Sequence, residues 1–193
     1  MQNKNNKKNK GYTIIETMIA ISLFIIIIMA GMGALLNANV LHNKSQNMRS
    51  IIDNLSFIME DMSRNLRTGY DYHCIDGTDG GSISGTNPYS CIDGGGISFK
   101  SSIDGSQWVY VIYDDGTIRK SVLGGADGTF IILNPEEIKI DSISSISVFG
   151  AEPPSGDLQQ PFVTIKLVGK ITYQNIETPF SLQTSVSQRQ IDI

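Results

Sequence analysis

Few side chains of this chain could carry out chemistry. Two cysteines, Cys74 and Cys91, and two histidines, His42 and His73, leave little material for a metal site. His73 stands beside Cys74, which raises the idea of a Cys–His nucleophile, but a disulfide cysteine next to a surface histidine is the expected reading. The sequence holds no metalloprotease, phosphate-loop or nucleophile-elbow motif. We therefore expect a protein that is not an enzyme and uses no cofactor.

Three aspartates among glycines, Asp76, Asp79 and Asp93, hint at a calcium-binding loop. An EF-hand loop closes with a glutamate at its twelfth position. Asn87 is twelfth when counted from Asp76, so the closing ligand of that motif is missing. We expect these aspartates to belong to ordinary turns, and we predict no metal site.

Glu16 stands at the start of an apolar stretch, which is an unusual place for a carboxylate. No charged side chain follows it until Lys44, and Met18–Leu36 is apolar apart from Ser22 and the glycines. A helix of about 20 apolar residues spans a bilayer. A charge at the centre of such a helix costs about 2.5–3.5 kcal/mol and less at its edge, so Glu16 is a functional candidate. A buried core helix is the alternative explanation of the apolar stretch.

The first ten residues are polar and carry four of the 15 Lys and Arg residues of the chain, with no acid among them. Lysines before a membrane segment hold the N-terminus in the cytoplasm, so the rest of the chain is expected outside. The net charge of the whole chain is −4. Because nucleic-acid binding needs a basic face, this balance argues against a nucleic-acid partner.

The residues at this junction resemble a known signal. The segment Lys10-Gly11-Tyr12-Thr13-Ile14-Ile15-Glu16, followed by Thr17-Met18-Ile19-Ala20-Ile21, is similar to the N-terminal signal of type IV pilins and type II secretion pseudopilins. The resemblance implies that a prepilin peptidase cuts between Gly11 and Tyr12, and that Tyr12 is then N-methylated. It makes Glu16 the fifth mature residue, where the family has a glutamate. The family usually has phenylalanine where this chain has Tyr12.

Cleavage at this bond would give Tyr12 a cationic amine one helical turn from Glu16. The carboxylate could pair with that amine or with the amine of a neighbouring subunit, and either pairing lowers the cost of burying it. An intersubunit pair would also set the axial register of neighbouring helices, so we assign Glu16 to assembly. The alternative is a glutamate at the membrane interface that faces water.

We expect one helix from Tyr12 to about Thr68, because the first proline is Pro88 and apolar residues recur at helical spacing beyond the membrane segment. Gly31 and Gly33 inside it could weaken the helix on assembly or allow close helix packing, and both readings stay open. The predicted organisation is a leader at 1–11, a transmembrane or filament-core helix at 12–36, an amphipathic half at 37–68 and a globular β-sheet domain at 69–193.

The composition changes at Gly69, which we expect to end the helix, because 16 of the 19 glycines and all six prolines lie from there onward. Residues 76–96 read as an irregular loop. Cys74 and Cys91 flank most of this loop, and on the exported side of a membrane they would be oxidised. We predict a disulfide between them that closes the loop, with two free thiols as the alternative.

Segments of β type follow, with a hairpin at Asp114-Asp115-Gly116. The expected strands are 97–100, 107–113, 117–123, 129–133, 143–149, 162–168 and 180–188. The predicted fold class is α+β, with a long N-terminal α-helix packed on a C-terminal, mainly antiparallel β-sheet. The resemblance implies the same architecture.

The expected function is that of a structural subunit, pilin-like and of the minor type, assembled into a type IV pilus-like filament. The partners implied by the resemblance are the prepilin peptidase, other pilin or pseudopilin subunits, a membrane assembly platform with its ATPase motor, and the lipid bilayer before assembly. The chain would be a single-pass membrane protein with an exported body, and later part of a cell-surface filament. The alternatives are a pseudopilin of a type II secretion system and a singly anchored exported receptor or enzyme.

Overall fold

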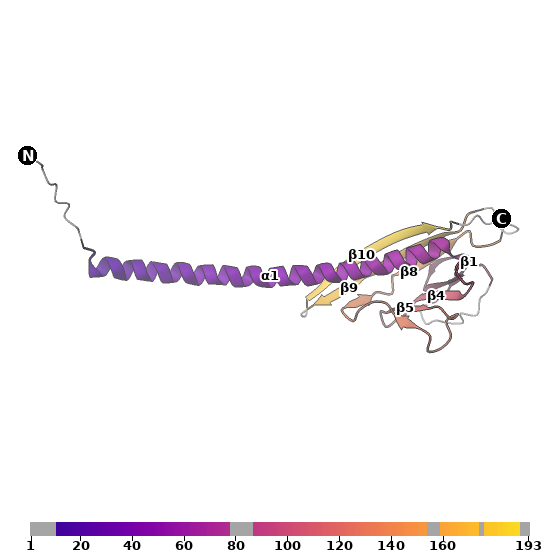
Figure 1. Ribbon diagram of the computed structural model, residues 1–193, viewed down its shortest axis with the longest axis horizontal. Helices are drawn as coiled ribbons and strands as arrows, with labels where there is room; N and C mark the ends of the chain where they lie inside the picture. The colour runs from indigo at the N-terminus through magenta and orange to yellow at the C-terminus, as the bar shows by residue number, and fades with distance from the viewer. Residues whose placement is uncertain (1–10, 78–86, 154–158, 174–175, 190–193) are drawn as a thin grey trace, which may run out of the picture. The chain divides into compact units, whose positions relative to one another are not determined.

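The structure is a computed structural model that describes residues 11–77, 87–153, 159–173 and 176–189 (Figure 1). In this part of the chain, one helix precedes ten strands. The chain divides into two units, residues 1–46 and 47–193, and each is described by itself. Helix α1, Ile14–Thr68, contributes to both. The fold class is α+β, as the sequence predicts.

Helix α1 confirms the single long helix expected from the hydrophobic spacing, although it begins at Ile14 and not at Tyr12. It ends before Gly69, whose N–H donates to the carbonyl oxygens of Asn65 and Leu66 at 3.0 and 3.2 Å. A Cβ on Gly69 would collide with the ring of Phe99. Glycine is therefore required here because an aromatic side chain packs directly on the backbone.

The strands form two antiparallel sheets of five strands each. The first sheet has the order β1-β3-β4-β5-β6, and the second has the order β10-β9-β8-β2, with β7 paired to β9. The strands are β1 Tyr70–Ile75, β2 Cys91–Gly94, β3 Gly96–Lys100, β4 Gln107–Ile112, β5 Ile118–Ser121, β6 Ile131–Ile132, β7 Ile138–Ile140, β8 Ser145–Phe149, β9 Phe162–Tyr173 and β10 Ile176–Ser187.

The sheet region is antiparallel, as the sequence predicts, but it is divided into two sheets, and three of its strands were not predicted. Strand β2 lies in the stretch expected to be an irregular loop, and β1 and β7 were not predicted. Strands β2 and β7 have only four and three residues, and each of the three strands is held by a partner distant in sequence: β1 by β3, β2 by β8 and β7 by β9. The predicted hairpin at Asp114-Asp115-Gly116 is confirmed, since Gly116 adopts a φ of 79° and Tyr113 N–H donates to the Thr117 carbonyl at 2.9 Å.

The core of the second unit lies between the C-terminal half of α1 and the inner faces of both sheets. On the helix, the buried side chains recur every three or four residues, which places them on one face. They are Ile51, Leu55, Ile58, Met59, Met62 and Leu66. Strand β9 alternates in the same way with period two, and it buries Val163, Ile165, Leu167 and Ile171. Figure 1 shows β9 and β10 running alongside this half of α1.

Asn134 ties the two sheets together from a buried position. Its side-chain oxygen accepts the N–H of Ile118 in β5 at 2.7 Å, and its side-chain nitrogen donates to the carbonyl of Ile138 in β7 at 2.8 Å. The same nitrogen lies 3.3 Å from the carbonyl oxygen of Gly116. The backbone adds a bond between the two sheets, from Ile140 N–H to the Gly116 carbonyl at 3.1 Å.

Candidate functional site

The predicted cleavage bond lies in non-helical backbone at the start of α1. Gly11, Tyr12 and Thr13 precede the first helical residue, Ile14, and all three are exposed. The side chain of Tyr12 is 83% exposed. Around Gly11, no described atom lies within 4 Å of the position a Cβ would take. Both residues that form the predicted cleavage bond are thus exposed, and the described chain leaves open space around Gly11.

Thr13 is the N-cap of α1. Its carbonyl oxygen accepts the N–H groups of Glu16 and Thr17 at 3.1 and 3.2 Å. Its side-chain oxygen accepts the same Glu16 N–H at 3.4 Å. Threonine with a glutamate three residues later is the sequence signature of a capping box. The role of Thr13 was not predicted from the sequence, although this local signature marks it.

Glu16 lies in the first turn of α1, where the positive end of the helix dipole favours a carboxylate. Its side chain is exposed, and among the described residues it makes no hydrogen bond or ion pair. The nearby polar side chains are satisfied differently. Thr17 Oγ1 donates to the Ile14 carbonyl at 2.8 Å, and Ser22 Oγ donates to the Ile19 carbonyl at 2.9 Å. In a bilayer, Glu16 would be the group that still needs a partner.

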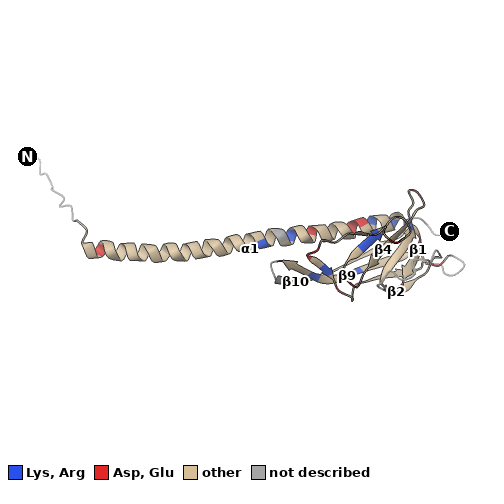
Figure 2. Cartoon of the chain, turned by 90° about the horizontal axis from the view of Figure 1, so that it is seen from below, with Lys and Arg blue, Asp and Glu red and all other residues tan. Residues whose placement is uncertain are grey.

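The apolar stretch forms an uninterrupted part of α1 with exposed side chains. No charged residue lies between Glu16 and Lys44, as Figure 2 also shows. By length and composition, α1 is apolar enough to cross a membrane. The large side chains from Ile14 to Leu41 are each at least 41% exposed. Such a surface requires a lipid or protein partner.

Gly31 and Gly33 do not break the helix in this chain, because α1 runs through both. No described atom lies within 4 Å of the Cβ position at either glycine. The single chain thus offers nothing that packs on them. The two alternatives for these glycines, weakening of the helix and close packing of a neighbouring helix, both refer to the assembled filament, so both stay open.

Cys74 and Cys91 form a disulfide in the structure, and this is the pair expected from the sequence. Cys74 belongs to β1 of the first sheet and Cys91 to β2 of the second, so the bond joins the two sheets as well as closing a loop. The two Cα atoms are 5.7 Å apart. A Cβ on Gly94 would lie 2.6 and 2.7 Å from the two sulfur atoms, so glycine at this position makes room for the disulfide.

Next to Cys91, Ser90 is held by the loop that follows β8. Its N–H and its hydroxyl both donate to the carboxylate of Glu152, with the N–H bond at 2.9 Å. Its hydroxyl oxygen also accepts the N–H of Ala151 at 3.0 Å. The disulfide at Cys91 and the hydrogen bonds of Ser90 thus hold the start of β2 in place.

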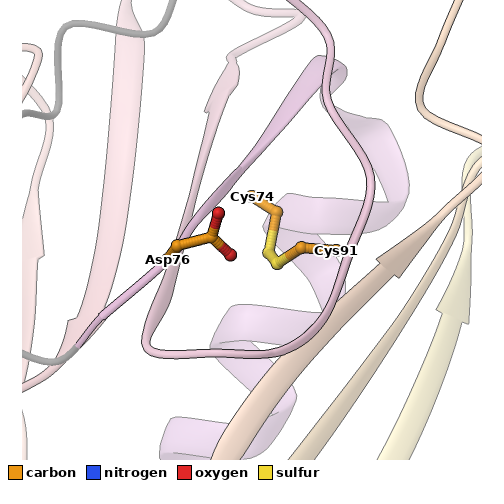
Figure 3. Close-up of side chains that lie close together, drawn as sticks. All are labelled: Cys74, Asp76 and Cys91. Atoms are coloured by element: carbon orange, nitrogen blue, oxygen red, sulfur yellow. A yellow bond between two sulfur atoms is a disulfide. The ribbon is translucent and has the colours of Figure 1, made fainter.

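Of the two described aspartates that hinted at a calcium-binding loop, Asp76 lies near other candidate ligands. Figure 3 shows its carboxylate facing the Cys74–Cys91 disulfide, and the ligand atoms of the three residues lie within 4.8 Å of one another. The two sulfur atoms are bonded to each other and are not thiolate ligands. Asp93 instead accepts a hydrogen bond from Ser145 Oγ at 2.9 Å, and Asp79 lies outside the described residues.

Neither histidine has a free thiol beside it, because both cysteines form the disulfide. A ring nitrogen of His42 lies 2.9 Å from the side-chain nitrogen of Gln46 on α1. Nδ1 of His73 lies 2.6 Å from the carbonyl oxygen of Asn87, and its ring packs 5.7 Å from that of Tyr89. Because the neighbouring Cys74 is in a disulfide, it offers no thiolate to His73.

A polar cluster joins α1 to the first sheet. One carboxylate oxygen of Asp61 accepts from Tyr110 Oη at 3.2 Å and from Lys120 Nζ at 3.1 Å, and Asn65 donates to Tyr110 Oη at 2.9 Å. Lys120 Nζ also lies 4.5 Å from the ring centre of Trp108. Burial raises the pKa of Tyr110, the bond from Asn65 opposes this rise, and Asp61 adds to it. Tyr110 therefore remains a hydrogen-bond donor at neutral pH.

Comparison with protein families matches residues 6–32 to the prokaryotic N-terminal methylation motif. The match covers the predicted cleavage bond, Glu16 and most of the apolar stretch. It supports the N-terminal signal of type IV pilins and pseudopilins. Searches of curated proteins and of solved structures found no match to the chain.

Proposed function

We propose, from the type IV pilin and pseudopilin signal that residues 6–32 carry, that this chain is a pilin-like structural subunit of a filament. It is cleaved by a prepilin peptidase, stored in the membrane and then assembled, and it is a minor subunit of a type IV pilus-like filament. The observation that carries the proposal is the methylation motif on an accessible Gly11–Tyr12 bond directly before an exposed apolar helix.

Cleavage is the first step of the proposed function. Nothing in the described chain packs against Gly11, so folding does not require glycine at that position. The requirement would come from the peptidase, whose active site must approach the backbone closely. The lysines before Gly11 support a cytoplasmic leader, and the Cys74–Cys91 disulfide supports an exported body, because disulfides persist in oxidising compartments.

The second step is the pairing of the new amine with Glu16. Cleavage leaves a cationic nitrogen on Tyr12, and N-methylation keeps that charge. Glu16 stands four residues on, and its carboxylate has no partner among the described residues. A pair with the amine of its own chain or of a neighbouring subunit removes the cost of an isolated charge in an apolar setting. A pair between subunits also fixes the axial register of adjacent helices.

The third step is transfer of the helix from lipid to a core of similar helices. The side chains of Met18–Leu36 are exposed in the single chain and make apolar contact in either environment. Because apolar contact is retained, helix association depends on packing and polar pairs rather than on the hydrophobic effect. An assembly platform and its ATPase motor can then drive the exchange at modest net cost.

The motif is shared by pseudopilins, so a subunit of a type II secretion machine is the second candidate function. The same chemistry of cleavage, pairing and helix transfer would serve protein export in that case. A tethered receptor or enzyme is the third. We propose that the chain has no catalytic role, because the candidate nucleophile Cys74 is in a disulfide.

The pairing is tested by the variant Glu16→Ala, with Ser22→Ala as the matched control. Ser22 is polar and lies in the same segment, but its hydroxyl bonds to its own helix. We expect both variants to insert into the membrane and to be cleaved. Glu16→Ala should be depleted from sheared filaments, and Ser22→Ala should appear there at the wild-type level. Normal incorporation of Glu16→Ala would reject the pairing.

A further inference from the structure

We infer that Thr13 is a positioning residue for the cleavage reaction: its N-cap holds the Gly11–Tyr12 bond outside helix α1, where a peptidase can reach it. The inference rests on the proposed processing of this chain. It assigns a role to a residue that is neither the site of cleavage nor the carboxylate of the assembly pair.

The hydrogen bonds at the start of α1 carry the inference. The first carbonyl that accepts helical N–H groups is that of Thr13, from Glu16 and Thr17 at 3.1 and 3.2 Å. The Thr13 side chain accepts the Glu16 N–H at 3.4 Å. Within the described residues, the carbonyls of Gly11 and Tyr12 accept no hydrogen bond. The helix therefore begins at Ile14, with only the capping residue Thr13 between it and the two residues that form the scissile bond.

Hydrolysis needs the Gly11 carbonyl to be free. Water adds to this carbonyl carbon and the bond to the Tyr12 nitrogen breaks, so that Gly11 leaves as a carboxylate and Tyr12 as an ammonium group. If α1 were to begin one turn earlier, the Gly11 carbonyl would accept the N–H of Ile15 and lie within helical backbone. Exposed backbone outside regular structure is the preferred substrate of proteolysis.

A stop signal is needed because the residues after Thr13 form a long, continuous helix, and adding a residue to an existing helix is easy compared with nucleation. Gly11 alone is a weak barrier, because one glycine lowers helix propensity only modestly. The hydroxyl of Thr13 stabilises a helix start at Ile14 in competition with earlier starts. Thr13 is exposed, and its side-chain oxygen makes no other hydrogen bond within the described chain.

The test compares two pairs of variants in the full-length precursor. Thr13→Ser and Thr13→Asn keep a capping oxygen, whereas Thr13→Val keeps the shape of threonine without it and Thr13→Ala removes both. Loss of an N-cap corresponds to about a five-fold change in an equilibrium, from its typical ~1 kcal/mol. We therefore expect membranes containing a prepilin peptidase to cleave the Ser and Asn variants at about the wild-type rate, and the Val and Ala variants more slowly, by at most about five-fold.

Amide hydrogen exchange of the uncleaved precursor in detergent micelles provides a second measurement. The Ile15 N–H should exchange rapidly in wild type and in Thr13→Ser, and should become protected in Thr13→Val through a bond to the Gly11 carbonyl. Slow cleavage of Thr13→Val without this protection would overturn the inference, because the hydroxyl would then be read directly by the peptidase. Equal rates for all four variants would overturn it as well. A wild-type chain that is never cleaved would instead reject the proposed function.

Discussion

Cys74 and Cys91 are joined by a disulfide although their strands, β1 and β2, belong to different sheets. The bond links residues 17 positions apart and lies against Gly94, whose missing side chain leaves space for both sulfur atoms. Cys74 is buried, with 2% of its surface exposed. The disulfide thus works as a covalent tie inside the second unit, at the place where the sheets meet.

Removing this tie should destabilise the second unit. A disulfide that closes a loop of about 15 residues contributes ~3 kcal/mol. We expect Cys74→Ser/Cys91→Ser to lower the free energy of unfolding by about that amount, measured by urea unfolding of the full chain in detergent micelles.

Gly94→Ala sharpens that experiment, because its added methyl group would lie 2.6 and 2.7 Å from the two sulfur atoms and 2.9 Å from the Ile75 carbonyl oxygen, and only the first two contacts depend on the disulfide. Gly94→Ala should therefore cost more in the wild-type background than in the double serine variant. Equal costs in both backgrounds would contradict the steric role of Gly94.

Asn134→Ala should weaken the second link between the two sheets, where the backbone bond from Ile140 to Gly116 remains. The substitution leaves the Ile118 N–H buried without its acceptor, which lies at 2.7 Å in the structure. Loss of a partner for a buried polar group costs about 1–3 kcal/mol. We expect a fall of this size in the free energy of unfolding, again by urea titration. Asn54→Ala, at an exposed position of α1, is the control and should change stability little.

The stability of the second unit should depend on Asp115 in acid. Hydrogen bonds from the Thr117 hydroxyl and N–H, together with Arg119, hold the pKa of Asp115 below its usual value. A lowered folded pKa means that the carboxylate stabilises the fold above the unfolded value of about 3.9. That contribution is lost as the pH falls through the lower folded pKa. Thermal unfolding between pH 2 and 6 should therefore show a smaller loss of Tm in acid for Asp115→Asn than for wild type.

The effect at Asp115 will be small, because half of its side chain is exposed and solvent screens the interaction with Arg119. Asp114→Asn, the neighbouring exposed position, is the control and should retain the wild-type pH profile. Identical acid profiles for Asp115→Asn and wild type would reject a role for this turn.

Gly11→Ala should block processing without disturbing the fold. The Cβ of alanine meets no described atom, so the variant should insert into membranes and unfold like wild type. It should remain at the mass of the precursor when a prepilin peptidase is present. A chain with a simple membrane tether predicts no difference between the two, and efficient cleavage of Gly11→Ala would contradict our account of the peptidase requirement.

The sequence predicted the parts of the molecule that depend on local pattern. The long helix followed from the spacing of apolar residues, and Glu16 stood out because a carboxylate at the start of an apolar stretch is costly. The disulfide partners followed from the presence of two cysteines in a segment expected outside the cytoplasm. The cap at Thr13 was also within reach, because threonine and glutamate three residues apart are a local signature.

Local sequence patterns did not predict the features that depend on pairing between distant segments. Strands β2 and β7 have four and three residues, and their pairing with β8 and β9 decides that they are strands. The division into two sheets depends on such pairs as well. The bridge through Asn134 joins its side chain to Ile118, 16 residues earlier, and no sequence pattern marks that contact.

The mass of the N-terminal peptide, measured on protein sheared from the surface of its native host, tests the central claim most directly. Our account predicts that the chain begins at Tyr12, with a methyl group on its nitrogen, in the sheared filament fraction. A chain that retains the lysine-rich leader and stays wholly in the membrane fraction would contradict it.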